Sequence, residues 1–372
     1  MTNSVHDAIV IGGGLHGLSS ALHLARSGMR VALLEKSWLG RHASGGSAAG
    51  VRTLNRALEE LPIALEAIEM WHSMEALVGD DCGFHAHGQI QIAVDPDDVR
   101  LLERRLEKSR AAGFNHEELI DADELHKLVP ALSRRCSAGL MVRRDGAADP
   151  HRTLIAFRRA AELAGVLIKE ECPVTRIERI GSGWRVTGND HTYEAPNVIN
   201  AAGAWSDKIA AMIGEEVSLG HKASMMIVTE RIAPFVKPVV GVAGRPLSFK
   251  QTDQGTLLIG GGLQGSADLD RQESYVDFLE LSKVAATATE LFPSIGCLRI
   301  VRTWAGMEAK THDLLPVIGP SAIAQGIFHA FGFSGHGFEL VPVVGAIIAD
   351  LVIDGGTNRK ITDFSAGRLH RQ

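Results

Sequence analysis

Cysteine is scarce in this chain, since its 372 residues include only Cys82, Cys136, Cys172 and Cys297. These four are far apart, with no C-x-x-C pair and no spacing that suits zinc or an iron–sulfur cluster. The sequence therefore predicts no metal site. It predicts reduced, mostly buried thiols of a cytoplasmic protein.

Extended basic runs and long apolar runs are also missing. The net charge is −6 and no run of five or more Lys or Arg occurs, so nucleic acid is not an expected partner. The N-terminal residues lack the basic and apolar segments of an export signal. The most apolar stretch, residues 340–353, covers about 14 residues and contains Asp350. It is too short to cross a membrane, and we expect a buried helix there.

The overall composition is that of a core-forming protein. Hydrophobic residues make up 45% and charged residues 22%, which excludes collagen, coiled coil and disorder. No repeat with a period of about 20–50 residues indicates a solenoid or propeller. The length favours two domains, or one large domain with a second layer. Glycine is abundant, with 40 residues, so the fold needs close backbone approach at several places.

The first 35 residues predict a strand, a glycine turn, a helix and a second strand. Residues 12–17 read GGGLHG, a G-x-G-x-x-G pattern, and Glu35 follows Gly17 by 18 residues at the end of the second strand. In such a unit Gly12 permits the tight turn, Gly14 lets a pyrophosphate approach the helix N-terminus, and Gly17 lets the helix pack on the strand. The spacing of Glu35 suits a ribose-binding acid. Dinucleotide binding is expected, with NAD and FAD both open at this point.

Apolar patterns in the rest of the chain predict further strands and helices. Residues 88–94 and several segments of 218–300 alternate as half-buried strands do, which favours an antiparallel sheet. Asp149 and Pro150 are typical of a helix start, and residues 198–203 predict a buried strand that ends at a glycine.

A second glycine pattern, GGGLQG at residues 260–265, lacks the context of the first. The residues that follow it show no helical periodicity, and no strand ending in an acid follows. A strand end and turn is the favoured interpretation, and a second dinucleotide site is the alternative.

Four further segments together carry a family resemblance. They are residues 41–52 (RHASGGSAAGVR), 198–206 (VINAAGAWS), 302–306 (RTWAG) and 331–338 (FGFSGHGF). In this order along nearly the whole chain, they resemble the D-amino-acid oxidase family of FAD enzymes, which includes glycine and sarcosine oxidases and proline and hydroxyproline dehydrogenases.

The resemblance implies an α/β fold with two interleaved domains. A Rossmann-like FAD-binding domain of the GR2 type would comprise residues 1–84, 145–217 and 301–372. An α+β substrate domain built on an antiparallel sheet would comprise residues 85–144 and 218–300.

The resemblance also implies which residues contact the cofactor. The loop after Glu35 would pass the flavin ring, Val174 would touch the adenine end, and the C-terminal glycine segment would meet the pyrimidine edge with the N-terminus of the following helix. The implied FAD contacts are Gly12, Gly14, Leu15, His16, Gly17, Glu35, Lys36, Arg41, Ala43, Ser44, Gly45, Gly46, Ser47, Ala48, Ala49, Gly50, Val174, Ala202, Gly203, Trp205, Gly306, Gly332, Gly335, His336, Gly337 and Phe338.

Several residues depart from the family pattern. Trp304 stands near the place where some members attach flavin to a cysteine, so noncovalent FAD is implied. Glu308 and Glu339 stand where some members carry cations that bind the substrate carboxylate. Arg52, Lys250 and Arg302 are the candidate anion binders, and Glu308 and Glu339 the candidate partners of a substrate amine. No residue is assigned as a catalytic base.

The expected function is oxidation of a small amino or imino acid, with hydride transfer from the amine-bearing carbon to flavin N5 and an imine as product. The W-A-G-x-E form of residues 304–308 looks more like the hydroxyproline and opine dehydrogenase branch, which favours cis-4-hydroxy-D-proline or a related cyclic imino acid. The alternatives are a sarcosine, glycine, D-amino-acid or opine oxidase, the FAD subunit of a hetero-oligomeric dehydrogenase, and an NAD-dependent dehydrogenase. Oxygen, a quinone or a partner protein would accept the electrons.

Overall fold

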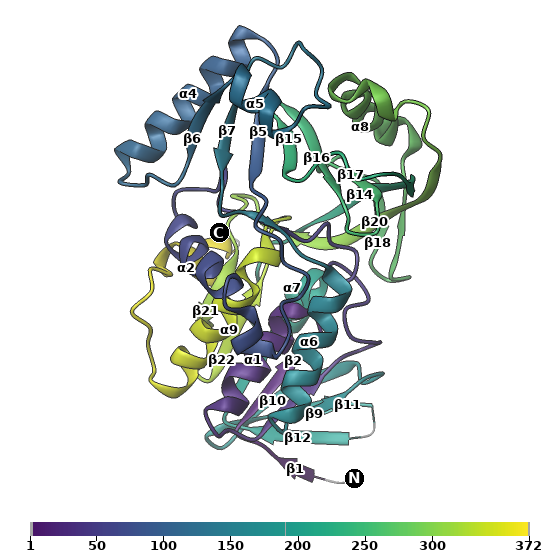
Figure 1. The fold of residues 1–372 in the computed structure, drawn as a ribbon. Coiled ribbons are helices and arrows are strands. Elements are labelled where there is room, and N and C mark those ends of the chain that lie inside the picture. The colour runs from purple at the N-terminus through teal and green to yellow at the C-terminus, as the bar shows by residue number, and fades with distance from the viewer. Residues whose placement is uncertain (1–2, 190, 371–372) are drawn as a thin grey trace.

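The computed structural model describes residues 3–189 and 191–370, and the chain forms two lobes (Figure 1). One lobe contains a six-stranded sheet covered by helices, and the other contains an eight-stranded sheet. Each lobe is assembled from segments that are far apart in the sequence.

The six-stranded sheet is mostly parallel. Its neighbouring strands run parallel except for the antiparallel pair at one edge. In sheet order the strands are β21 (Val317–Pro320), β22 (Ile327–Phe331), β13 (Asn197–Asn200), β2 (Ala8–Ile11), β3 (Val31–Leu34) and β9 (Leu167–Lys169).

The two faces of this sheet pack against different layers. Ala8 and Val10 of β2 join a core with the helices on one face, whereas Ile9 and Ile11 join a core with a four-stranded sheet on the other. Both faces are buried, which explains the continuous apolar runs of these strands. The helices are α1 (Leu15–Arg26), α2 (Leu61–Trp71), α3 (Met74–Val78), α6 (Pro150–Leu163) and α9 (Gly337–Ile353); the small sheet is β1 (Asn3–Val5), β12 (His191–Ala195), β11 (Gly183–Gly188) and β10 (Val174–Ile180).

The eight-stranded sheet is antiparallel apart from the parallel pair β15–β5. Helices α5 (Ala122–Leu128) and α8 (Phe278–Leu291) share a core with one face, and α4 (Pro96–Ala111) shares a core with the other. In order the strands are β20 (Ile300–Lys310), β14 (Gly220–Arg231), β17 (Thr256–Gly260), β16 (Arg245–Gln251), β15 (Val239–Val242), β5 (Gln89–Ala93), β7 (Ala138–Val142) and β6 (Glu118–Asp121).

Short elements connect these layers. They are the strand pairs β4 (Gly50–Val51) with β8 (Gly146–Ala147) and β18 (Ser266–Asp268) with β19 (Glu273–Tyr275), the helix α7 (Ser206–Ala211), and four 3-10 turns at Gly203–Trp205, Pro293–Ile295, Thr362–Phe364 and Ala366–Leu369.

The architecture confirms the expected α/β fold with an interleaved, largely antiparallel second sheet. The domain boundaries stay a prediction. Strand β20, which the boundary at residue 301 assigns to the FAD-binding segments, pairs with β14 in the eight-stranded sheet. Residues 260–265 are the end of β17 and a turn before β18, as the favoured interpretation expected.

The apolar residues of the segment 57–77 recur at helical spacing, but the first helix there does not span the segment. It begins only at Leu61, with Pro62 in its first turn, and it ends before Ser73, where α3 starts anew. Proline is tolerated in the first turn of a helix and not in its interior, which explains the late start. Cys82, Cys136 and Cys172 are buried thiols and Cys297 is exposed, as expected for mostly buried cysteines. Among the described residues no helix is both long and apolar enough to cross a membrane.

A buried carboxylate ties the C-terminal segment to the rest of the lobe. Glu215 accepts hydrogen bonds from the Ser321 hydroxyl (2.5 Å), the Ala322 N–H (3.0 Å), His329 Nε2 (2.9 Å) and His370 Nε2 (3.1 Å). Burial alone would raise the pKa of Glu215, but the bonds from His329 and Ser321 outweigh it and lower the pKa to about 2. The ionised form therefore stabilises the fold.

We predict that Glu215→Gln lowers the free energy of unfolding by about 3 kcal/mol at neutral pH, because several donors lose a buried charged acceptor. The pKa of Glu215 is lowered on folding, so its stabilisation is complete above about pH 4.5 and is lost as the pH falls toward 2. Denaturant unfolding of both proteins against pH measures this difference.

The exposed neighbour Glu216 provides the matched control. Glu216→Gln is expected to change the unfolding free energy by less than about 0.5 kcal/mol. If the difference in unfolding free energy between wild type and Glu215→Gln does not decrease below about pH 4.5, the stabilising role of the ionised Glu215 is contradicted.

Candidate functional site

The first glycine turn brings three backbone segments together. Gly12 has φ +111°, and a Cβ on it would lie 2.3 Å from the Ala201 carbonyl oxygen after β13. A Cβ on Gly17 would lie 1.9 Å from the Gly12 carbonyl oxygen. No side chain fits at either position, so β2, α1 and the end of β13 approach closely only with glycine here. The predicted residues Ala202 and Gly203 follow directly at this crossing.

The N-terminus of α1 is the polar end of this turn. Gly14 is its N-cap and offers no side chain to the first-turn N–H groups. The Leu15 N–H donates to the Ser44 hydroxyl at 3.0 Å, and that hydroxyl is also the atom nearest to a Cβ built on Gly14, at 3.1 Å. Helix N-termini with such N–H groups attract anions. The arrangement fits a pyrophosphate between the turn and residue 44.

Glu35 lies beside the turn with its carboxylate held in place. One oxygen accepts from the Gly13 N–H at 2.7 Å and the other from the Ser37 N–H at 2.8 Å. The Cys172 N–H donates to the Glu35 carbonyl at 2.8 Å, which brings the chain leading to Val174 alongside. This geometry is compatible with the predicted ribose and adenine contacts.

Lys36 and Trp205 meet from different segments. Lys36 Nζ lies 2.8 Å from the centroid of the Trp205 ring, and burial lowers the pKa of Lys36 to about 7. The Arg41 guanidinium lies over Trp38 and donates to the Ser37 hydroxyl at 2.9 Å. The basic side chains of Lys36 and Arg41 therefore both lie on the Glu35 side of the turn.

The loop of residues 41–50 contacts strand β20 of the other lobe. The Trp304 indole N–H donates to the Gly46 carbonyl at 3.0 Å, and a Cβ on Gly46 would lie 3.6 Å from Gly306 Cα. Ser47 accepts from the Ala49 N–H at 2.9 Å, and Ala49 has φ +52°. The loop has small residues at Ala43, Gly45, Ala48 and Gly50. Small side chains leave room beside the loop for the flavin ring that the resemblance implies.

The C-terminal glycine segment meets the first turn. The His16 ring stacks on Phe333 with centroids 3.6 Å apart, and a Cβ on Gly337 would lie 2.9 Å from His16 Nε2. Burial lowers the pKa of His16 to about 3, so its imidazole is neutral at physiological pH. Residues 332–338 and 12–17 are thus neighbours, and Gly337 begins α9.

A buried cluster of charges lies under the N-terminus of α9. Arg56 Nη2 binds Glu339 at 2.5 Å and donates to the His336 carbonyl at 2.9 Å. Glu60 Oε2 lies 3.6 Å from His336 Nδ1, and burial lowers the pKa of His336 to about 4. No sequence pattern singled out Arg56 and Glu60, because Arg and Glu four residues apart are usual on exposed helices.

The five predicted substrate residues are not all brought together. Glu339 is fully enclosed beside Arg56, and burial raises the pKa of Glu339 to about 8. Arg52 belongs to the same region and donates to the Leu54 carbonyl at 2.7 Å. Lys250 is buried and donates to the Ala148 carbonyl at 3.1 Å, directly behind Ala49. Arg302 is exposed at the start of β20.

Glu308 reaches the C-terminal glycine segment from the other lobe. A Cβ on Gly335 would lie 3.5 Å from Glu308 Oε1. Trp304, Gly306 and Glu308 alternate along β20 and so lie on one face of it. That face joins the Gly46 loop to the Gly335 segment.

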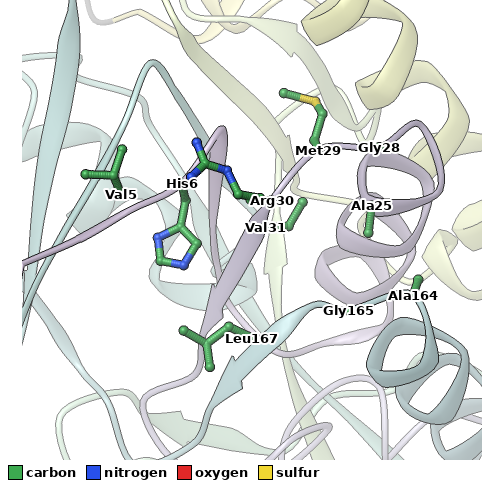
Figure 2. A pocket seen from close by; sticks show the side chains of 10 residues that line it. All are labelled: Val5, His6, Ala25, Gly28, Met29, Arg30, Val31, Ala164, Gly165 and Leu167. Atoms are coloured by element: carbon green, nitrogen blue, oxygen red, sulfur yellow. The ribbon is translucent and has the colours of Figure 1, made fainter.

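A surface hollow of about 460 Å³ lies at the opposite end of the six-stranded sheet (Figure 2). It lies at the amino ends of β3 and β9, and its lining residues are Val5, His6, Ala25, Gly28, Met29, Arg30, Val31, Ala164, Gly165 and Leu167. Ligands of open parallel sheets bind at the carboxyl ends of the strands. We therefore place the functional site at the glycine turn. No cluster of three potential metal ligands occurs within residues 3–189 and 191–370.

Comparisons with known proteins show the family of this chain. A family model described as FAD dependent oxidoreductase (DAO) matches residues 7–351. The mitochondrial dimethylglycine dehydrogenase of Rattus norvegicus is 29% identical over 375 residues, which cover 94% of this chain and 43% of that protein. This chain thus spans less than half the length of that relative. The sarcosine oxidase subunit beta of an Arthrobacter species is 27% identical, over 98% of this chain and 91% of that protein.

A solved structure extends the similarity to the whole fold. The crystal structure of L-proline dehydrogenase from P. horikoshii superposes with a TM-score of 0.91 and 26% identity, covering 99% of this chain and 98% of that one.

We predict that Gly17→Ala abolishes retention of FAD, because the added methyl would collide with the Gly12 carbonyl and push α1 away from the turn. The flavin absorbance per protein after gel filtration measures retention. Gly356→Ala is the control, since a Cβ there meets no atom within 4 Å. Full flavin content in Gly17→Ala would show that the close crossing is not required for binding.

Proposed function

This chain belongs to the DAO family of FAD-dependent oxidoreductases, and on that premise we propose that it oxidises a small amino or imino acid at the carbon that bears the amine. FAD held at the first glycine turn would supply the acceptor for the hydride that leaves this carbon, and an imine would be the product. The observation that carries the proposal is the face of β20 formed by Trp304, Gly306 and Glu308, which lies against both Gly46 and Gly335.

The chain's own residues have distinct tasks in this proposal. Gly12, Gly14 and Gly17 let the pyrophosphate approach the N-terminus of α1. Glu35 accepts hydrogen bonds from the ribose hydroxyls. The N-terminus of α9 offers N–H groups and a positive dipole end at the pyrimidine edge, where negative charge increases during reduction. FAD is noncovalent, since the position near the ring has Trp304 in place of a cysteine.

The substrate is held at the gap over Gly306. Arg52 and Lys250 remain the candidate binders of a carboxylate, and Glu308 is the candidate partner of the amine. Glu339 is already hydrogen-bonded to Arg56 inside the fold, so we assign it to holding the Arg56 side chain in place. Trp304 closes one side of the gap and keeps water away from the reacting carbon.

Within this class we favour cis-4-hydroxy-D-proline or a related cyclic imino acid. The whole-chain similarity to an L-proline dehydrogenase supports a cyclic imino acid. Sarcosine, glycine, other D-amino acids and opines are the alternatives. The similarity to a sarcosine oxidase subunit favours a second proposal, that the chain works as the FAD subunit of a hetero-oligomer that passes electrons to a partner protein. Otherwise oxygen or a quinone accepts them.

We predict that the purified protein is yellow and that its flavin is bleached anaerobically by a cyclic imino acid. D- and L-forms of proline and 4-hydroxyproline, sarcosine, glycine, D-alanine and an opine form the panel, and absorbance near the flavin maximum is the measurement. Lactate, the hydroxy acid with the same carbon skeleton as alanine, is the control. Bleaching by the hydroxy acid and by no amine would contradict amine oxidation, and a colourless protein would support the NAD-dependent alternative.

Turnover of the isolated chain with a dye acceptor separates the two proposals on electron transfer. Full turnover with the dye is expected if this chain suffices for substrate oxidation. Copurification of small subunits, together with turnover only in their presence, is expected of a hetero-oligomer.

A further inference from the structure

Four polar side chains from three segments form a connected group beside Gly335. Gln264 Oε1 accepts from the Ala223 N–H at 2.7 Å, and its amide nitrogen lies 3.4 Å from the Ser224 hydroxyl. Ser224 donates to Glu308 at 3.1 Å. Lys222 Nζ lies 3.9 Å from Glu308 and donates to the Ser334 carbonyl at 3.1 Å. The group thus runs without a break from the second glycine turn to the C-terminal glycine segment.

The register of β14 and β20 explains why these side chains meet. Lys222 is directly opposite Glu308, and Ser224 is directly opposite Gly306. Directly opposite residues in an antiparallel pair share a face. A Cβ on Gly306 would lie 3.6 Å from the Gly46 carbonyl oxygen and 3.8 Å from the Ser224 carbonyl oxygen, so the missing side chain lets β20 lie close to the Gly46 loop.

The second triple glycine has a structural reason in this arrangement. A Cβ on Gly260 would lie 2.3 Å from Met226 Sδ, and one on Gly265 would lie 2.0 Å from the Tyr275 carbonyl oxygen. Gly260 lets the chain lie close to β14 and Gly265 lets it lie close to the end of β19, and between them Gln264 forms a bridge pair with Ser224. The turn therefore fixes Gln264 against Ser224.

Glu308 has the properties of a group that receives a cation. Burial raises the pKa of Glu308, while Lys222, Ser224 and the Gly335 backbone oppose this shift. The Lys222 ammonium at 3.9 Å is bound to the Ser334 carbonyl, so it leaves the carboxylate only partly compensated. By contrast, Arg56 holds Glu339 at 2.5 Å. An ammonium or protonated imino group entering over Gly306 would complete the charge balance of Glu308.

We propose that Glu308 binds the amine nitrogen of the substrate, and that Gln264 is a positioning residue that orients Glu308 through Ser224. This inference rests on the proposed function and deepens it, because it names the group that distinguishes an amino or imino acid from a carboxylic acid of the same carbon skeleton. It also assigns a role to residues 260–265.

Anaerobic stopped-flow reduction of the holoenzyme tests the proposal. The probe is the panel compound that reduces the wild-type flavin fastest, and its apparent Kd and limiting rate are measured from pH 6 to 10. The competing ligand is the carboxylic acid of the same skeleton without the amine, titrated by the change in flavin absorbance. If no amine reduces the wild-type flavin, the proposed function fails at this first step and the inference falls with it.

For Glu308→Gln we expect the Kd of the amine substrate to rise at least about tenfold, because a charge-assisted bond is lost. The Kd of the amine-free acid is expected to stay within about twofold of wild type. The pH dependence of amine binding is expected to flatten. If amines reduce the wild-type flavin and both ligands keep their affinities in Glu308→Gln, the assignment of Glu308 is overturned while the proposed function stands.

Gln264→Met tests the positioning role, with Gln91→Met as the matched control. Gln91 is a half-buried glutamine in the same sheet whose amide donates to the Val242 carbonyl, far from Glu308 in sheet order. We expect Gln264→Met to raise the amine Kd about three- to tenfold and to shift the pH profile, with flavin content and unfolding temperature matching those of Gln91→Met. Equal amine Kd values and pH profiles in the two variants would overturn the role of Gln264.

Discussion

Three backbone segments approach one another at the first glycine turn more closely than any side chain permits. The Gly12 carbonyl occupies the place where a Cβ of Gly17 would lie, and the Ala201 carbonyl occupies that of Gly12. This crossing aims the N-terminus of α1 at the carboxyl ends of the parallel strands. Helix α9 packs on α1, and the segment that precedes α9 stacks Phe333 on His16. The placement of α1 against β13, and through α1 that of the segment before α9, therefore depends on this close contact between main chains.

The pair of strands β14 and β20 connects these segments to the other lobe. These two strands pair at ten positions, from Gly220 with Lys310 to Thr229 with Ile300. Trp304 reaches the Gly46 carbonyl from the same face that holds Glu308 near Gly335. A substrate between the two lobes would thus meet side chains of β14 and β20 whose positions are set by sheet register. Rigid strands hold such groups more firmly than loops do.

Three buried or partly buried carboxyl groups, those of Glu215, Glu339 and Glu308, have different partners. Glu215 has four donors around it, and its pKa is lowered. Glu339 has Arg56, but complete enclosure raises its pKa. Glu308 is only partly enclosed and faces a lysine that is bound elsewhere. The first two carboxylates have their main partners within the chain, which leaves the third with capacity for a ligand.

The sequence alone determined the strand, turn and helix at the N-terminus, some strands of the second sheet and the family resemblance, because these depend on local periodicity and on glycines at fixed spacing. It did not determine that Glu339 pairs with Arg56, or that Gln264 reaches Glu308 through Ser224. Those contacts join residues separated by 283 and by 40 or more positions, and only the packing of α9 and the register of β14 bring them together. Local patterns report which face of an element is apolar. The partner that a buried polar group finds is decided by the tertiary fold, since burial makes an unpartnered charge costly wherever its partner lies in the sequence.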